Sequence, residues 1–429
     1  MDIIIELTII EETELLKKFA KNQWLYISLF TILAFSLLTL ANYQFASTNP
    51  GGNDFLVHWM GTRNFVTEGT SPYSDETALN IQTLIYGRAA QEGEHEMRVA
   101  YPLYSIFLFL PFALIKDYVL ARALWMSVLE ISLVLITILS LRLTFWKVRP
   151  LWLAGFLLFV ILSYHGARPL INGNAIIVIT LFVLLALMCI RNGKDEAAGI
   201  LLALSTIKPQ NVILLVAFVL LWAIFNKRTK IIAYFLGSMF LLVGFATVLI
   251  PDWFVQDFRE ILRYPSYNPP LSLGAAVAAK FGGVGQRLSY VITGVLTTLL
   301  LFEWWLGRFA DTKRFLWLAF LTIAISQWIG ISTDPGNFIL LYPGMFFCFA
   351  MIDARWKGKS KLFIGILLGV LLVGLWMLFL VTAHHSYTLI QSSYMFLPMP
   401  FVCLLLLYWV RWWSVKSNRI NSFESFDFL

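Results

Sequence analysis

One acidic residue stands where the first long apolar segment gives way to a polar stretch, NDFLVHWMGTRNFVTEGTSPY at residues 53–73. Asp54 begins what reads as an amphipathic helix, so its carboxylate is expected just outside a bilayer. A carboxylate in that position suits a general base acting on a lipid-linked substrate. His58 follows one turn later on the same face, and Gly61 continues that face without bulk, which predicts room for a substrate.

Cations on the same side of the membrane could hold an anionic ligand, and six are expected there: Arg63, Arg168, Lys208, Arg263, Lys280 and Arg287. Lys208, in STIKPQN, follows a short apolar segment and precedes a proline, so two short helices should meet there at membrane depth. An ionisable group in that place is a functional candidate, because leaving it unpaired in lipid is costly. An anionic lipid phosphate would satisfy it.

Structural alternatives exist for each of these residues. Asp54 could only cap its helix, together with Asn53, and His58 could be an interfacial side chain beside Trp59. Lys208 could be a lysine that extends its ammonium to the membrane surface.

The remaining acidic residues give weaker signals. Glu303 is expected to pair with Arg308, one turn away, whereas the intramembrane Glu130 has no evident partner. Asp334, in the turn STDPGN, is a reserve candidate for the base. No nucleotide-binding loop, serine nucleophile elbow or HExxH motif is present. The cysteines have neither disulfide nor zinc-ligand spacing, so no metal site or cofactor is expected: Cys189, Cys348 and Cys403.

Composition sets the class of protein that must position these groups. Of 429 residues, 59% are hydrophobic and 13% charged, and the mean hydropathy is +0.75, which together indicate an all-α polytopic membrane protein. The net charge of +7 comes from short basic clusters between apolar segments, as the positive-inside rule predicts. The expected partner is therefore the lipid bilayer, with no nucleic acid.

The apolar segments predict about twelve transmembrane helices in a single domain, residues 1–429. The first, Trp24–Tyr43, is long enough to be a retained signal anchor, with residues 1–23 cytoplasmic. The others are expected at Tyr118–Ser140, Leu151–Tyr164, Asn174–Ile190, Ala197–Ile207, Asn211–Phe225, Ile231–Ile250, Leu288–Leu306, Phe315–Ile331, Phe338–Ile352, Leu362–Val381 and Phe396–Val410.

The positions of the basic clusters decide whether Tyr101–Ile115 is interpreted as a transmembrane helix. This segment is apolar, but it is short and contains two prolines. The basic clusters near 191–194 and 227–230 fall on the cytoplasmic side only if the segment does not cross the membrane. Residues 44–117 are then a large first extracytoplasmic loop with juxtamembrane amphipathic helices, one near Thr77–Ile85. Residues 251–287 form a later extracytoplasmic loop, and 411–429 a cytoplasmic tail.

Several motifs then occur in a recognisable order. DFxxxxxxxRxFVTEGTSPY (54–73) is followed by YPLYSIFLFLPFALI (101–115), INGNAIIVITLFVLLAL (171–187) and AAGILLALSTIKPQ (197–210). This order resembles the polyprenol-phosphate-mannose-dependent α-(1→2)-mannosyltransferases, bacterial membrane enzymes of the GT-C superfamily. The likeness covers roughly the first 230 residues, and beyond them it is mostly a matching hydropathy pattern.

The resemblance matches the family's first-loop aspartate to Asp54, its G-x-x-P-Y turn to Gly69, Pro72 and Tyr73, and its lysine-proline turn to Lys208 and Pro209. Tyr101 and Pro102 match its tyrosine-proline element, although the usual second proline is Leu103. The glycine-glutamine-x-asparagine element reads Gly173-Asn174-Ala175-Ile176 here. With Asp54 as the catalytic base, the expected substrate-binding residues are His58, Arg63, Tyr101, Arg168, Asn174, Lys208 and Asp334.

The resemblance implies a GT-C-like fold and transfer of a sugar, mannose, from a polyprenyl-phosphate donor to a hydroxyl of a glycolipid or glycan acceptor. The sugar would be transferred in one inverting displacement, on the extracytoplasmic face of the cell's inner (plasma) membrane. A transporter or flippase is the alternative, with Glu130, Asn174 and Lys208 lining a pathway. A scaffolding membrane protein would not need so large a loop of mixed charge.

Overall fold

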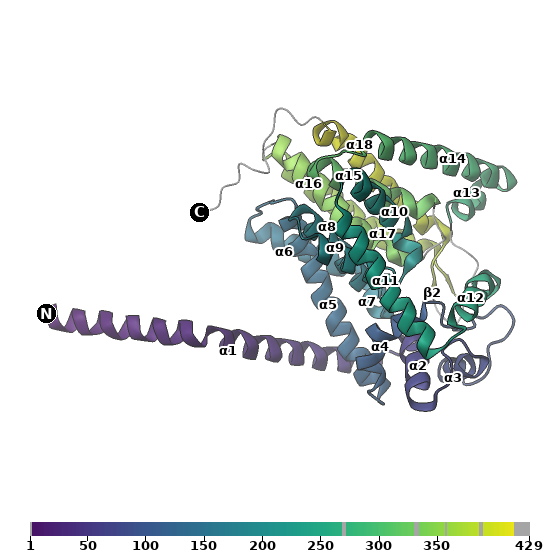
Figure 1. Ribbon diagram of the computed structural model, residues 1–429, viewed down its shortest axis with the longest axis horizontal. Helices are drawn as coiled ribbons and strands as arrows, with labels where there is room; N and C mark the ends of the chain where they lie inside the picture. Colours follow the sequence, from purple (N-terminus) through teal and green to yellow (C-terminus); the bar gives the residue numbers. More distant parts are fainter. Residues whose placement is uncertain (1, 268–271, 330–333, 357, 386–388, 416–429) are drawn as a thin grey trace.

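The computed structural model describes residues 2–267, 272–329, 334–356, 358–385 and 389–415 (Figure 1). Almost all of this part is helical. Its two short strands, β1 (His384–His385) and β2 (Leu389–Ile390), pair antiparallel with His384 opposite Ile390. The predicted all-α class is thereby confirmed for the part of the chain that the structure describes.

The helices follow in chain order, with three short 3-10 helices among them. They are α1 (Asp2–Thr48), α2 (Asn53–Glu68), α3 (Asp75–Tyr86), η1 (Leu103–Ser105), α4 (Ile106–Ala113), α5 (Tyr118–Leu143), α6 (Pro150–Leu162), α7 (Tyr164–Asn172), α8 (Ile176–Arg191), α9 (Asp195–Ser205), α10 (Pro209–Phe225), α11 (Thr229–Leu249), α12 (Trp253–Tyr267), α13 (Leu273–Phe281), α14 (Gly283–Leu306), α15 (Thr312–Ile329), η2 (Pro335–Leu341), α16 (Tyr342–Trp356), α17 (Ser360–Thr382), η3 (Ser393–Phe396) and α18 (Pro398–Val415).

Within the described residues, seven helical segments are long and apolar enough to cross a membrane. The count becomes eight if α6 and α7, which meet at a bend of 52°, form one span. Four of the twelve predicted spans, α8, α9, α10 and α15, are not among these segments, and they have 16, 11, 17 and 18 residues, fewer than the roughly 20 that span the hydrocarbon core. The number twelve therefore stays a prediction.

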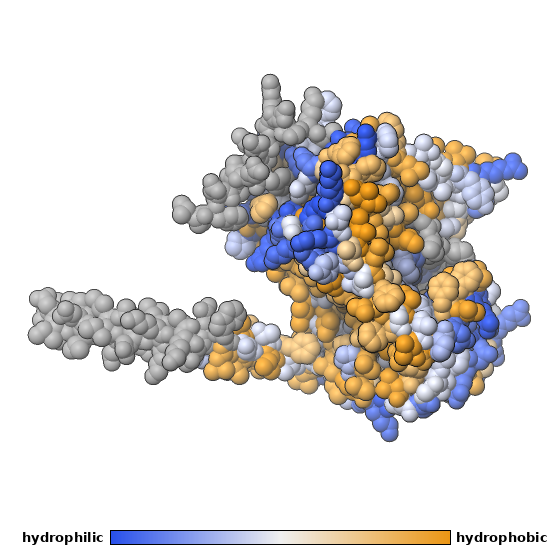
Figure 2. All heavy atoms as spheres, in the orientation of Figure 1, coloured by the Kyte–Doolittle hydropathy of each residue, from blue (hydrophilic) through white to orange (hydrophobic). Residues whose placement is uncertain are grey.

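The basic loops lie together at one end of the helical bundle. Arg191 at the end of α8 donates to the carbonyl oxygens of Arg142 and Leu143 at the end of α5, both over 2.7 Å. Near the same end, Arg228 before α11 pairs with Asp195 at the start of α9. Figure 2 shows polar residues here, around α6, α8 and α9, and again at the far end over α3 and α12, with apolar residues between.

Two intramembrane acids have partners that the sequence did not reveal. Glu303 pairs with Arg411 of α18 over 2.8 Å, so the predicted pair with Arg308 is wrong, and Arg308 donates to the Trp305 carbonyl instead. Glu130 of α5 accepts from the Asn42 amide of α1 over 2.8 Å. This bond ties α1 to α5, since a polar pair between helices is favourable in lipid.

The far end is built by the first loop. The helix predicted near Thr77–Ile85 is α3, with Ser74 as its N-cap. The segment Tyr101–Ile115 forms η1 and the short α4, which packs on α2 through ring contacts of Phe55 with Phe109 and Phe112 at 6.3 and 6.1 Å. The region 251–287, predicted as a loop, is largely helical and holds α12, α13 and the start of α14.

Candidate active site

Asp54 lies at the second position of α2, and its side chain does not cap the helix. The N-cap is Gly52, which has a φ of 76° and makes no side-chain capping bond. Asp54 Oδ2 instead accepts a hydrogen bond from Asn174 Nδ2 over 2.8 Å. The capping interpretation of Asp54 is therefore wrong. Its carboxylate is held by the turn that leads into α8.

Lys208 lies in the turn between α9 and α10 and is 4% exposed. Its Nζ donates to Asn174 Oδ1 and to Asn337 Oδ1, both over 2.8 Å, and lies 5.5 Å from the centre of the Tyr101 ring. A lysine held by two amides inside the protein does not extend to the membrane surface, which excludes the alternative for Lys208. Asn174 thus connects the carboxylate to the ammonium: its amide nitrogen donates to Asp54 and its oxygen accepts from Lys208.

Gly173 allows this turn to approach α2. Its φ is +72°, and a Cβ atom built there would lie 2.5 Å from the Cβ of Phe55. The Gly173 carbonyl accepts from Trp125 Nε1 of α5 over 2.8 Å, and the Trp125 ring stacks on Phe55 at 5.7 Å. The neighbour of Asp54 in the chain is therefore packed against both the turn and α5, which places Asn174 within reach of the carboxylate.

Burial and charge act in opposite directions on the central pair. Burial raises the pKa of Asp54, while the Lys208 ammonium opposes that rise and Asp334 adds to it. Burial lowers the pKa of Lys208 to about 8. Asp54 is thus a stronger base than a surface aspartate, and the nearby positive charge favours its ionised form.

Arg168 and Asp334 form a second pair beside the first, with side chains that are 25% and 41% exposed. Arg168 Nη1 lies 3.3 Å from Asp334 Oδ1 and also donates to Tyr164 and Gln391. Asp334 caps η2 by accepting from the Gly336 amide over 2.5 Å, and its other oxygen accepts from Gln391. Both carboxylate oxygens of Asp334, the reserve candidate for the base, therefore accept hydrogen bonds within the protein.

His58 lies between two rings, with centroids 3.9 Å from that of Tyr101 and 4.8 Å from that of Phe109. Burial and the Lys208 charge lower its pKa to about 3, so it is neutral at physiological pH. Tyr101 in turn accepts at its carbonyl from the Tyr73 hydroxyl over 2.7 Å, which joins the two loop motifs. The space beside Gly61 is already filled by the protein, because a Cβ atom built on Gly61 would lie 2.7 Å from the Val99 side chain. The predicted room for a substrate at this position is therefore absent.

The structure does not bring every predicted cation to this cluster. Arg63 lies nine residues beyond Asp54, about 13.5 Å along the helix, and donates to the Ala113 carbonyl over 2.9 Å. Lys280 and Arg287 are exposed on α13 and α14, and Arg263 belongs to α12. The cluster thus consists of Asp54, His58, Tyr101, Arg168, Asn174, Lys208 and Asp334, with Asn337 and Gln391 added by the structure.

The transporter alternative required Glu130, Asn174 and Lys208 to share a pathway. Glu130 lies five residues beyond Trp125, about 7.5 Å along α5 from the ring that stacks on Phe55. Its carboxylate faces Asn42, whereas the other two side chains bond to one another at the Asp54 cluster. Glu130 thus belongs to the contact between α1 and α5 and not to the cluster that contains Asn174 and Lys208.

A family model described as Glycosyltransferase family 87 matches residues 100–329, which is more than half of the chain. The matched range includes Tyr101, Arg168, Asn174 and Lys208, and it leaves out Asp54 before it and Asp334 just after it. No curated protein and no solved structure matches the chain significantly. The chain belongs to glycosyltransferase family 87, a family of membrane glycosyltransferases.

Proposed function

We propose that this glycosyltransferase moves mannose from a polyprenyl-phosphate donor to a hydroxyl of a glycolipid or polysaccharide acceptor, on the extracytoplasmic face of the cell membrane. Asp54 is the general base. The observation that carries the proposal is the hydrogen-bonded series Asp54, Asn174 and Lys208, in which a carboxylate and an ammonium share one amide.

The hydrogen bonds within the described residues engage only Oδ2 of Asp54. Oδ1 can therefore accept a hydrogen bond from the acceptor hydroxyl. In the transfer, the proton of that hydroxyl passes to Asp54, its oxygen bonds to C1 of the sugar, and the bond from C1 to the phosphate oxygen breaks. The electron pair leaves on polyprenyl phosphate, and a single displacement inverts C1.

A phosphate leaves readily at neutral pH, so this reaction needs cations beside the leaving group more than a general acid. Lys208 uses two N–H groups for Asn174 and Asn337, which leaves the third for a ligand. The bonds described for Arg168 all use Nη1, so its Nη2 can approach a phosphate oxygen. These two cations are the proposed phosphate-binding groups.

Depth in the membrane supports a lipid donor. The helices α8 and α10 run from the end with the basic loops to Asn174 and Lys208, and they rise about 24 and 26 Å. The hydrocarbon core is about 30 Å thick. The Asp54 cluster is thus expected near the opposite boundary of the core, where a phosphate attached to a long polyprenyl chain would enter from the lipid.

The proposal is tested by supplying polyprenyl-phosphate mannose to the purified full chain in lipid nanodiscs, together with a hydroxyl acceptor, and identifying the products by mass. The expected products are polyprenyl phosphate and an acceptor heavier by one hexose, with inverted configuration at C1 by NMR. Transfer from a nucleotide sugar, with none from the lipid donor, would contradict the proposal.

A further inference from the structure

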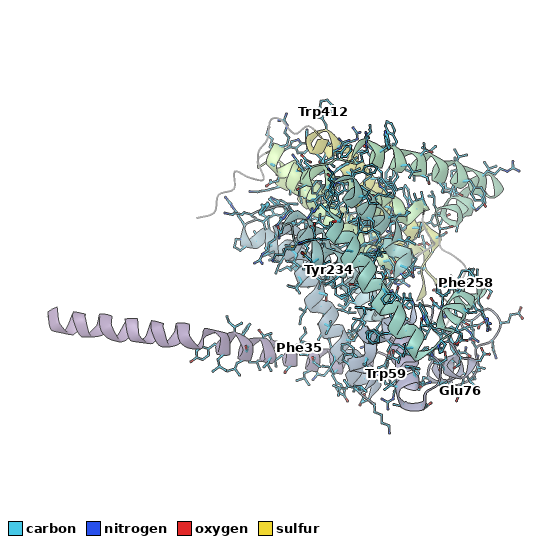
Figure 3. All side chains as sticks on the ribbon, viewed as in Figure 1. Phe35, Trp59, Glu76, Tyr234, Phe258 and Trp412 are labelled. Atoms are coloured by element: carbon cyan, nitrogen blue, oxygen red, sulfur yellow. The ribbon has the colours of Figure 1, made fainter. Side chains whose placement is uncertain are left out.

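A polar cavity of about 370 Å³ lies at the Asp54 end of the molecule, separate from the Asp54 cluster. It opens between the segment that follows α3 and the C-terminal part of α12; in Figure 3, Glu76 marks α3 and Phe258 marks α12. Its lining includes Gln82, Glu94, Glu96, Arg98, Arg263 and Tyr267. The volume falls in the range of small-molecule sites, about 300–1,000 Å³.

Carboxylates neutralise the two guanidinium groups that line this cavity, and one further lining carboxylate, Glu92, has no ion pair among the described residues. Arg98 pairs with Asp75 and, over 2.8 Å, with Glu96, and Arg263 pairs with Glu96 over 2.7 Å. Glu94 pairs with Arg88 over 2.7 Å. Since the two lining guanidinium groups already have carboxylate partners, the cavity offers no unpaired positive charge to an anionic ligand. It presents hydrogen-bonding groups to a neutral one.

One buried polar group in the lining lacks a partner. Tyr267 is 8% exposed, and its hydroxyl has no hydrogen-bond partner among the residues that the structure describes. Its ring is fixed edge-on against Tyr264 at 5.4 Å and His95 at 5.1 Å. A buried hydroxyl left unpaired is unfavourable, so a ligand hydroxyl that displaces the atoms covering it from the cavity side would supply the missing bond.

The cavity is close to the proposed reaction centre. Arg98 in its lining is three residues from Tyr101, a separation of at most about 11 Å along extended chain. Tyr101 contacts His58 and lies beneath Lys208. An oligosaccharide whose terminal hydroxyl reaches Asp54 could therefore place an earlier sugar unit at Tyr267.

We propose that this cavity binds a neutral hexose unit of the acceptor glycan, with the Tyr267 hydroxyl as a hydrogen-bond partner. The inference rests on the proposed glycosyl transfer for the identity of its ligand. A neutral sugar supplies both donors and acceptors without adding charge, which fits a lining with paired guanidinium groups and, among the described residues, one unpaired carboxylate at Glu92 and one unpaired phenol at Tyr267.

Binding is measured first, by saturation-transfer NMR with α-1,2-mannotriose and the full chain in nanodiscs. Tyr267→Phe removes only the hydroxyl and is expected to weaken binding about three- to tenfold. Ala90→Trp fills the cavity from its rim, keeps the backbone bond from Ala90 to Gln82, and is expected to abolish binding. Tyr290→Phe, at an exposed tyrosine of α14, is the control and should change nothing.

Absence of mannotriose binding to the unchanged chain, or equal binding by the chain and both cavity variants, would overturn the proposal. So would tighter binding of a uronic-acid trisaccharide than of mannotriose.

Kinetics separate this proposal from the function on which it rests. In the transfer assay, Tyr267→Phe should raise KM for the acceptor three- to tenfold, with kcat and the donor KM unchanged. An unchanged acceptor KM in an active enzyme would overturn the cavity proposal alone. Binding of mannotriose that depends on Tyr267, in a chain that transfers nothing from the lipid donor, would support the cavity and refute the proposed function.

Discussion

At the scale of single residues, Asn174 determines how the acid and the lysine act together. Its amide nitrogen donates to Asp54 and its oxygen accepts from Lys208, so both groups are satisfied by one side chain that cannot itself carry charge. Direct contact between the two ions would weaken Asp54 as a base. The intervening amide keeps Oδ1 of Asp54 for the acceptor while the positive charge remains near.

Replacement of Lys208 tests the proposed phosphate site. Lys208→Ala should raise the donor KM or lower kcat more than Lys208→Arg does, because a positive charge in this turn is what the phosphate needs. Initial rates at several concentrations of polyprenyl-phosphate mannose would measure the difference. Unchanged donor kinetics in the alanine variant would remove Lys208 from the phosphate site.

The pH dependence of the same variants tests the coupling between Lys208 and Asp54. Asp54 must be ionised to accept a proton, so kcat/KM should rise as pH increases through its pKa. Burial raises that pKa and Lys208 lowers it, so loss of the lysine charge should raise it further. The acidic limb of the profile should therefore move to higher pH in Lys208→Ala and stay in place in Lys208→Arg. An acidic limb at the same pH in both variants would contradict the proposed coupling between Lys208 and Asp54.

The sequence identified reactive residues better than it identified their partners. Asp54 and Lys208 stood out because an ionisable group beside an apolar segment is rare, and Asn174 entered through the family motif. Asn337 closes the STDPGN turn and could have been suspected, whereas Gln391 had no signal. Neighbours along a helix were misleading: Glu303 lies one turn from Arg308 but pairs with Arg411, because tertiary packing placed a guanidinium nearer.

At the scale of elements, the turn from α7 to α8 positions the site, and Gly173 makes that turn possible. Gly173→Ala should add about 1–2 kcal/mol of strain for the left-handed backbone and a further 1–3 kcal/mol for overpacking against Phe55. Both the melting temperature in detergent and the transfer rate should fall, because the turn carries Asn174.

Gly87→Ala is a matched control for this change. Gly87 has a nearly identical φ of +71° and ends α3, and no atom of the described residues lies within 4 Å of the place that a Cβ would take. It should suffer the backbone strain but not the clash, and it should keep its transfer activity. Equal losses of stability and activity in both variants would contradict the proposed role of the α7–α8 turn.

Hydropathy predicted the long elements well and the amphipathic ones unevenly. Apolar runs such as α5, α11 and α17 were located within a few residues, because an intramembrane helix must be continuously apolar. The helix α12 was predicted as loop, since its alternating apolar and charged residues, with Pro265 near its end, resemble a surface segment. That helix nevertheless supplies Arg263, Ser266 and Tyr267 to the lining of the polar cavity.

At the scale of the whole molecule, the helices separate two polar ends. α5 has 26 residues and a rise of about 39 Å, and it connects Tyr118 beside the Asp54 cluster to Arg142 among the basic loops. The positive-inside rule assigns the basic end to the cytoplasm and therefore the Asp54 cluster to the opposite face. This assignment of sides remains a prediction.

Cysteine labelling checks the assignment. In a background that lacks the three native cysteines, Gln91→Cys should react with an impermeant maleimide added to intact cells, because Gln91 is exposed at the Asp54 end. Arg228→Cys, at the basic end, should react only after permeabilisation. Labelling of Arg228→Cys in intact cells would reverse the topology.

The turnover of Asp54→Asn is the most direct test of the proposed mechanism. Asparagine keeps the size of the side chain and cannot take up the proton, so transfer should fall by about 10²–10⁴-fold while the protein still purifies and binds the lipid donor. Asp117→Asn, at the capping aspartate of α5, is the matched control and should remain active. Turnover near normal in Asp54→Asn, with Asp334→Asn inactive, would contradict the account and move the base to the turn before η2.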